Sequence, residues 1–369
     1  MRARTTRFLG TTAAVAVGAG LLTTGVAAAT PPANGLKEVV AAAGSDTIFG
    51  VTGAIFTDAN KTTPTPVFNT DPDNYVNIPP VLASGQSFTV PADLFNPAIT
   101  YNASNPPPDG SGAGKAALKA SADANNGAID LARSSSARST SDPATFEYYA
   151  FARDGVTWSS SATGAGAGLT LTLTQLRDIY RGTITNWNQV GGTNAAIKLY
   201  LPQVGSGTLS FFTGTVLGFD PATLPGVTVQ RFQENDATSI LAADQSSAIA
   251  PFSIASWVAQ GNNVLTNKRG GYTVNKLTGA SSDGSPVTGT SGSYAPAFAD
   301  AFLGARLVFH VLDNRTKSYN AAKRGVGFDT NDTVNTASPL CGGKLATTLT
   351  KYGFKTLPAQ SNGLFCVKS

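Results

Sequence analysis

Charged side chains are scarce in this chain. Of its 369 residues, 13% are Asp, Glu, Lys or Arg, against roughly 25% in an average soluble domain. The formal net charge is only +4, and no cluster of basic residues could form the face that a nucleic-acid-binding protein requires. We therefore expect no nucleic-acid partner, and a surface that depends on Ser, Thr, Asn and Gln for its solubility.

Residues that carry catalysis or bind metals are equally few. The single histidine, His310, lies in the apolar run 306–312, which is typical of a packed, hydrogen-bonded side chain rather than a catalytic base. The chain has no G-x-S-x-G elbow, and the segment DPDN at 71–74 lacks the glycine and the terminal glutamate of a calcium loop. Around Lys115 the sequence resembles a nucleotide-binding loop, but Asp109 and Ala116 replace a required glycine and the magnesium-binding hydroxyl. The sequence thus predicts a protein that is not an enzyme and holds no metal or cofactor; a secreted hydrolase or phosphatase is the disfavoured alternative.

The N-terminus has the pattern of an export signal. Three arginines within the first seven residues precede an apolar stretch, 8–26, which ends in the small residues AAA at 27–29. This order is typical of a secretory signal peptide, here 1–29, whose removal brings the net charge close to zero. A transmembrane anchor is the alternative, disfavoured by the glycines and threonines in the stretch. No cysteine lies near the cleavage site, so we expect a periplasmic or extracellular protein without a lipid anchor.

Two cysteines, Cys341 and Cys366, are the only ones in the chain, and both lie near the C-terminus. In an exported protein such an isolated pair predicts one disulfide bond. A metal site is the alternative, but the chain has no further cysteine and His310 is its only histidine.

Short β-prone segments alternate with helical ones along the chain. Strands are expected at 36–42, 87–91, 128–132, 148–158, 197–201 and 248–252. Helices are expected after Gly110–Gly114, from an N-cap at Thr174, after Gly205–Thr208 and after Phe252. Strands interleaved with helices over this length predict an α/β architecture with parallel or mixed sheets.

Several of the expected strands run into small, hydroxyl-rich turns that open helices. Such turns occur at Gly44–Thr47, Gly110–Gly114 and Gly205–Thr208, with a variant without glycine at Arg133–Ser136. A helix N-terminus leaves N–H groups unpaired and carries partial positive charge, glycine admits close approach, and Ser or Thr adds a donor. Each turn alone could be a simple helix cap. Together they predict a site for an oxyanion, and Arg133 could contribute a bidentate guanidinium.

At these residues the chain resembles the PstS-type periplasmic phosphate-binding proteins of ABC importers. The resemblance is strongest over 128–257, where the segment 171–192, LTLTQLRDIYRGTITNWNQVGG, is followed by GSGT at 205–208 and by IAPFSIASWVAQ at 249–260. The N-terminal AAAGSDT and GSGAGK match the family's first two ligand loops more loosely. The resemblance implies a type II periplasmic-binding fold, with two lobes, a cleft between them and two hinge crossings.

Carried over residue by residue, the resemblance implies a set of ligand-binding positions in this chain. With the Arg133 turn added, the expected ligand-binding residues are Ser45, Asp46, Thr47, Ser111, Arg133, Ser134, Ser135, Ser206, Gly207 and Thr208. This chain departs from the family in its charges. Pro202 and Val204 stand where the family has Arg and Asp upstream of GSGT, and Ser135 replaces the family's cleft acid.

The resemblance also implies an organisation and a function. Lobe I is expected to comprise 30–152 and 253–369, and lobe II 153–252. The function expected is that of a monomeric solute-binding protein that captures an inorganic oxyanion, phosphate by default, for delivery to an ABC permease. The alternative is a secreted binding or adhesion module on the same fold without a dedicated importer.

Overall fold

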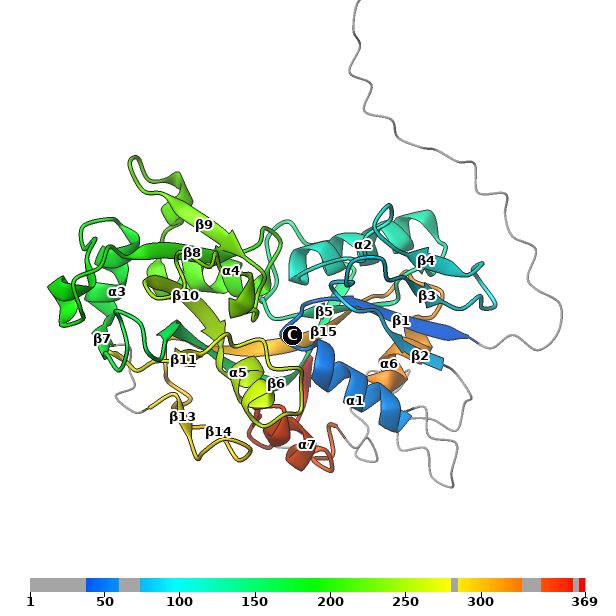
Figure 1. Ribbon diagram of the computed structural model, residues 1–369. Coiled ribbons are helices and arrows are strands. Elements are labelled where there is room, and N and C mark those ends of the chain that lie inside the picture. The colour runs from blue at the N-terminus through cyan, green and yellow to red at the C-terminus, as the bar shows by residue number, and fades with distance from the viewer. Residues whose placement is uncertain (1–37, 60–73, 280–284, 327–339, 361–364, 369) are drawn as a thin grey trace, which may run out of the picture.

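The computed structural model describes residues 38–59, 74–279, 285–326, 340–360 and 365–368. These residues form an α/β protein around one long mixed sheet (Figure 1). Its strands run in the order β2 (Asn74–Asn77), β1 (Val39–Gly44), β5 (Leu131–Ser134), β15 (Ala305–Asp313), β6 (Phe146–Ser161), β10 (Ala248–Ser253), β8 (Lys198–Pro202) and β9 (Val229–Phe232). Three further strands pair with β6: β11 (Tyr272–Val274), β16 (Lys355–Thr356) and β17 (Val367–Lys368).

The remaining described elements are short. Two-stranded sheets pair β3 (Phe88–Val90) with β4 (Ile99–Tyr101), β7 (Leu171–Thr172) with β12 (Leu277–Thr278), and β13 (Val287–Thr288) with β14 (Ala295–Pro296). The α-helices are α1 (Phe49–Ala59), α2 (Ser111–Ala124), α3 (Leu173–Tyr180), α4 (Gly207–Phe211), α5 (Ile254–Gly261), α6 (Tyr319–Gly325) and α7 (Ala346–Lys351). Helix α4 continues as a π-helical turn, Phe212–Leu217.

Strand β6 links the two halves of the molecule. It is 16 residues long and rich in aromatic residues, and all but three of its residues are buried. It pairs antiparallel with β15 over 146–155 and with β10 over 156–159. In Figure 1 the half that contains α3, β8 and β10 and the half that contains α1, α2 and β1 lie on opposite sides of this region. The strand predicted at 148–158 is therefore confirmed, as part of a longer strand that both halves share.

Each half has its own core. In the first half, alternate residues of β1 belong to different clusters: Val40 and Ala42 pack with α1, whereas Val39, Ala41 and Ala43 pack with Leu118 of α2. Because successive side chains of a strand point to opposite faces, helices cover both faces of this part of the sheet. The other half has a single cluster that runs from Val156 to Phe302. It extends beyond residue 252, where the sequence placed the end of lobe II.

Several local predictions are confirmed, and two are wrong. All six expected strands are present within a few residues, and helices follow the turns at 110–114 and 205–208. The N-cap of α3 is Thr172, not Thr174, because Gln175 stands three residues after Thr172 and completes a capping box with it. No helix follows the Arg133–Ser136 turn, which leads into an irregular segment.

Cys341 and Cys366 form the predicted disulfide bond. The expected signal peptide lies outside the described residues. Within the part of the chain that the structure describes, no helix has the length and hydrophobicity to cross a membrane.

Replacing both cysteines by serine should lower the free energy of unfolding by about 3 kcal/mol, because the bond closes a loop with a sequence separation of 25 residues and restricts the unfolded chain. Urea denaturation of the double variant and of the oxidised protein measures the difference. Equal midpoints for the two proteins would show that the bond contributes nothing to stability.

Candidate functional site

The four predicted turns converge at the junction of the two halves. Gly112 N donates to Gly205 O at 2.9 Å, which joins the second turn to the GSGT turn. Ser45 N donates to Arg133 O at 3.0 Å and joins the first turn to the third. A Cβ atom on Gly110 would lie 2.5 Å from Gly205 O, so only glycine permits the two backbones to approach this closely.

Buried serine hydroxyls from three of these turns contact one another. Ser45 Oγ donates to Ser135 Oγ at 3.0 Å, and Ser135 Oγ lies 3.3 Å from Ser111 Oγ, which also accepts from Ser135 N. A Cβ on Gly207 would lie 2.3 Å from Ser111 Oγ and 2.5 Å from Ser135 Oγ. The GSGT backbone is thus pressed directly against these hydroxyls.

Ser206 is also fully buried and caps α4, its Oγ accepting from Leu209 N at 3.0 Å.

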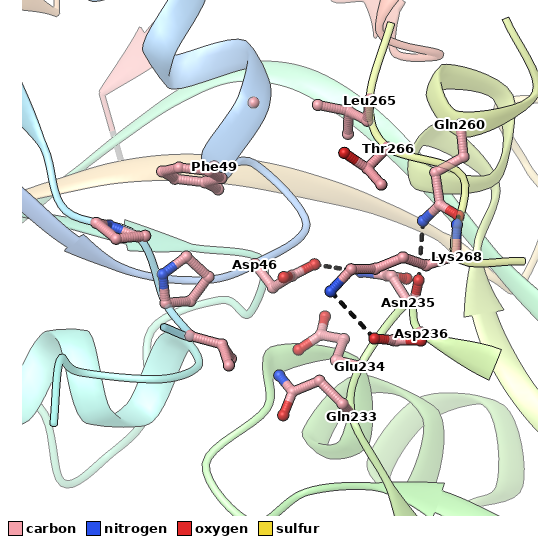
Figure 2. A pocket seen from close by; sticks show the side chains of 14 residues that line it. Asp46, Phe49, Gln233, Glu234, Asn235, Asp236, Gln260, Leu265, Thr266 and Lys268 are labelled. Atoms are coloured by element: carbon pink, nitrogen blue, oxygen red, sulfur yellow. Dashed lines mark hydrogen bonds and ion pairs between the residues drawn. The ribbon is translucent and has the colours of Figure 1, made fainter. Parts of the chain in front are cut away.

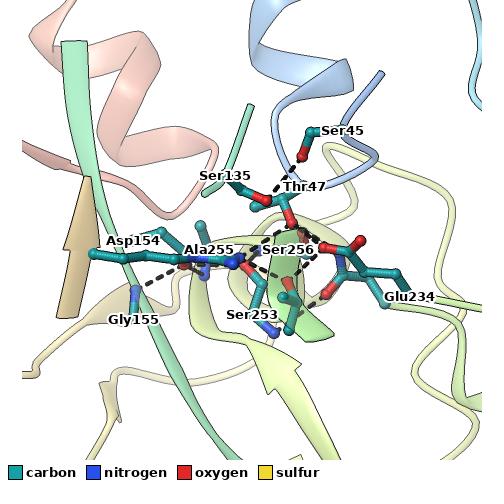
Figure 3. A network of polar contacts seen from close by, with 12 residues as sticks. Ser45, Thr47, Ser135, Asp154, Gly155, Glu234, Ser253, Ala255 and Ser256 are labelled. Carbon is teal, nitrogen blue, oxygen red and sulfur yellow. Dashed lines mark hydrogen bonds and ion pairs between the residues drawn. The ribbon is translucent and has the colours of Figure 1, made fainter. Parts of the chain in front are cut away.

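A second group of contacts joins Thr47, Thr208, Glu234 and Arg306. Figure 3 shows Thr47 and Glu234 of this group close to Ser45 and Ser135. Thr47 Oγ1 donates to Glu234 Oε1 at 2.6 Å, and Thr208 Oγ1 donates to the same oxygen. Arg306 Nη2 donates to Thr208 Oγ1 at 2.8 Å and to Thr47 Oγ1 at 3.3 Å. The hydroxyl protons of both threonines are therefore directed to Glu234 in this conformation.

Arg306 is held by Asp154 in the shared strand β6. Its Nε and Nη2 donate to Asp154 Oδ2 at 3.1 and 2.8 Å, while Asp154 Oδ1 accepts from Ser253 Oγ and Ala255 N. Both charged side chains are almost completely buried. Among the described residues, Arg306 Nη1 and Glu234 Oε2 are buried without a hydrogen-bond partner.

Arg133 is in the junction but does not face a ligand site. Its Nη1 donates to Ala42 O and Asn77 Oδ1, its Nη2 to Gly44 O and Ile78 O, and its Nε to Ser45 O. A guanidinium has five N–H donors, and all five are used. The Arg133 side chain is fully committed to four backbone carbonyls and to Asn77, and it has no donor left for an anion in this conformation.

The other two predicted residues lie at the edge of the cluster. Ser134 Oγ donates to Ser136 O at 2.8 Å and stabilises its own turn. Asp46 lines a neighbouring cavity and accepts from Asn235 Nδ2 at 3.2 Å. Burial, followed by the charge of Glu234, raises the pKa of Asp46 to about 7. Figure 2 shows its carboxyl group among the side chains that surround this cavity.

Sequence reasoning missed Arg306, Glu234 and Asp154 as members of one cluster. Arg306 opens the same apolar run that contains His310, and an arginine at the start of such a strand was the available signal. Glu234 lies in an irregular segment, QEND at 233–236, that no motif marks. Asp154 pairs with Arg306, and neighbouring Arg153 pairs with Asp300.

His310 has the packed position that its sequence context predicted. Its ring stacks on Phe151, its Nε2 lies 3.0 Å from Thr52 Oγ1, and burial lowers its pKa to about 3. Within the described residues, no three His, Cys, Asp or Glu side chains are placed to hold a metal ion.

The fold and the hydroxyl-rich interlobe junction define a class: a two-lobed binding protein of the periplasmic type. The sequence profile of the PBP superfamily domain matches residues 96–302, more than half of the chain. The protein belongs to this superfamily, and its fold is the two-lobed periplasmic-binding fold.

Solved structures are similar to this chain at low sequence identity. One is a substrate-binding protein from Clostridium perfringens, described as a phosphate ABC transporter component with bound phosphate: 15% identity, TM-score 0.53, covering 87% of this chain and 100% of that one. Another is an ABC-type phosphate transport receptor from Vibrio cholerae: 18% identity, TM-score 0.49, covering 86% and 100%. Among curated proteins, none matches the chain.

Replacing Arg133 by Met should destabilise the protein by about 3–5 kcal/mol, because the change leaves a set of buried carbonyl oxygens without donors. Urea denaturation measures this loss. Any protein that still folds should bind its ligand as the wild type does, since Arg133 has no donor to spare. A variant of normal stability and reduced ligand affinity would contradict this assignment.

Replacing Asp46 by Asn should change how stability depends on pH. Because the folded-state pKa is about 7 and the ordinary value is 3.8, the folded protein binds the extra proton between these values, and the stability it confers is lost as pH rises through 7. The stability of wild type relative to Asp46→Asn should therefore fall between about pH 4 and pH 8. Denaturation curves across this range test the sign, and a constant difference would refute the raised pKa.

Proposed function

We propose that this protein is an exported solute-binding protein that captures an inorganic oxyanion, phosphate by default, between its lobes for delivery to an ABC importer. The observation that supports this most directly is the buried guanidinium of Arg306. Its Nη1 has no partner among the described residues. Its Nη2 donates to the hydroxyls of Thr47 in the first turn and Thr208 in the GSGT turn.

Hydroxyl and backbone groups would provide the remaining donors. Ser45, Ser111, Ser135 and Ser206 are fully buried and come from four separate turns. In the first turn of α2, which begins at Ser111, the N–H groups of Ser111 and Ala113 lack partners within their own helix, whereas Gly112 N already donates to Gly205 O. Such a set binds an oxyanion largely through hydrogen bonds, so that the site needs no large excess of positive charge.

The charges of the cluster favour an oxyanion that keeps a proton. Arg306 is already paired with Asp154, and Glu234 brings a further carboxylate to the same hydroxyls. The family's Arg and acid positions near GSGT are Pro202, Val204 and Ser135 here, so Arg306 and Glu234 supply these charges from elsewhere in the chain. A fully deprotonated sulfate cannot donate to acceptor oxygens, whereas hydrogen phosphate can.

Lobe boundaries also belong to this proposal. The cores support a second lobe that begins near Asp154 and extends past residue 252 to about Phe302. Thr47 and Thr208, which lie in different halves, both contact Glu234 and Arg306. Separation of the lobes would break these contacts, and a ligand that binds both sides would stabilise the closed form.

Replacing Ser206 by Ala should weaken phosphate binding by one to two orders of magnitude, because a hydrogen bond to a charged group contributes about 1.5–3 kcal/mol. Arg306→Lys should weaken it at least as much, since lysine retains the charge beside Asp154 but lacks the free Nη1 donors. Calorimetry with phosphate, arsenate and sulfate on protein stripped of bound ligand measures these effects.

Thr172→Ala is the matched control, because it also removes the side chain that caps a short helix but lies at α3, away from the cluster. It should leave phosphate affinity unchanged. If no oxyanion binds the wild type, or if Ser206→Ala and Thr172→Ala behave alike, the proposed function is wrong.

A further inference from the structure

A separate cavity of about 190 Å³ adjoins the hydroxyl cluster. Its walls come from the start of α1, the turn at 79–81, the segment 233–236 and the segment 260–268 (Figure 2). At about 30 Å³ per water molecule, this volume suits a small organic molecule rather than a single ion.

Carboxyl groups outnumber cations around this cavity. Asp46, Glu234 and Asp236 line it, together with Lys268, whose Nζ lies 3.1 Å from Asp236. Lys268 thus neutralises Asp236. Neither Asp46 nor Glu234 forms an ion pair with a described residue, and Figure 2 shows both carboxyl groups turned toward the same space.

Glu234 provides a second, independent indication of a ligand. Its side chain is 1% exposed, and its Oε2 is buried without a partner in the described part of the chain. An unpaired buried carboxylate oxygen costs free energy that a donor from a bound molecule would recover. Burial raises the pKa of Asp46, and the nearby charge of Glu234 raises it further, whereas Lys268 lowers it.

The opposite wall is apolar. Phe49, Pro79, Pro80, Val81 and Leu265 line it. Such a wall would contact methylene or methyl groups and exclude water from them. The carboxylates of the lining repel an inorganic oxyanion, and these apolar side chains have no donor to offer it.

We propose that this cavity binds a small organic cation, an ammonium group on a short aliphatic body, with Glu234 and Asp46 as the acceptors and the Phe49–Val81 side as the apolar contact. The proposal does not rest on capture of an oxyanion, since it uses Glu234 Oε2 and a cavity outside the serine cluster. It predicts a ligand chemistry distinct from that of inorganic phosphate.

The test is calorimetry with n-butylammonium chloride, compared with n-pentanol, a neutral molecule of similar size, and with sodium butyrate. Wild type should bind butylammonium at least tenfold more tightly than pentanol and should not bind butyrate. Glu234→Gln should weaken butylammonium binding at least tenfold, because it removes the charge and the unpaired acceptor.

If Glu234→Gln does not fold, two lysine variants test the same cavity, one inside its lining and one outside. Val81 lines the cavity and is 46% exposed, and Leu241, which does not line it, is 57% exposed. Val81→Lys places a competing ammonium at the cavity and should reduce binding at least tenfold, whereas Leu241→Lys should not change it.

The proposal is overturned if butylammonium does not bind at about 10 mM, if pentanol binds equally well, or if the two lysine variants bind alike. A separate phosphate titration of the wild type distinguishes the two proposals. If the wild type binds butylammonium but not phosphate, the proposed function alone is refuted. If it binds phosphate but not butylammonium, this inference alone is refuted.

Discussion

The buried ion pair between Asp154 and Arg306 is the interaction on which the junction of the two halves depends. Asp154 lies in β6 and Arg306 in β15, and the two residues are register partners in the sheet. The position is where β6 passes from one hydrophobic core to the other, since Ala152 belongs to a cluster of the first half and Val156 to that of the second. A buried pair of this kind recovers its desolvation cost only when further hydrogen bonds complete it. Here Ser253, Ala255, Thr47 and Thr208 provide those bonds.

Arg133 performs a comparable task within the first half. Its guanidinium collects four backbone carbonyls and Asn77, and so fixes the turn that carries Ser45 to Thr47 against β5 and the segment after β2. Arg306 instead donates to side chains, those of Asp154, Thr47 and Thr208. Among the described residues, Arg306 Nη1 has no partner, whereas every donor of Arg133 has one. This is why only Arg306 enters the proposed oxyanion site.

Glu234 separates the two ligand chemistries that we propose. One carboxylate oxygen of Glu234 accepts from Thr47 and Thr208. The other oxygen has no partner within the part of the chain that the structure describes, and Glu234 also lines the adjoining cavity. A single side chain in an irregular segment thereby gives negative charge to a region that the turns alone would make suitable for an anion. The electrostatics of the junction follow from this residue as much as from the glycine-rich turns.

Local sequence determined the elements, the serine-rich turns and the disulfide. Alternating apolar residues, capping hydroxyls and glycines at close approaches act over a few residues, so β1, α2, the GSGT turn and the buried His310 could be predicted from them. Only the tertiary structure decided which charges meet. Arg306 lies 152 residues from Asp154, and Thr47 lies 187 residues from Glu234. Such pairings depend on how the sheet brings distant strands together, and the same long-range contacts turned Arg133 toward backbone carbonyls instead of a ligand.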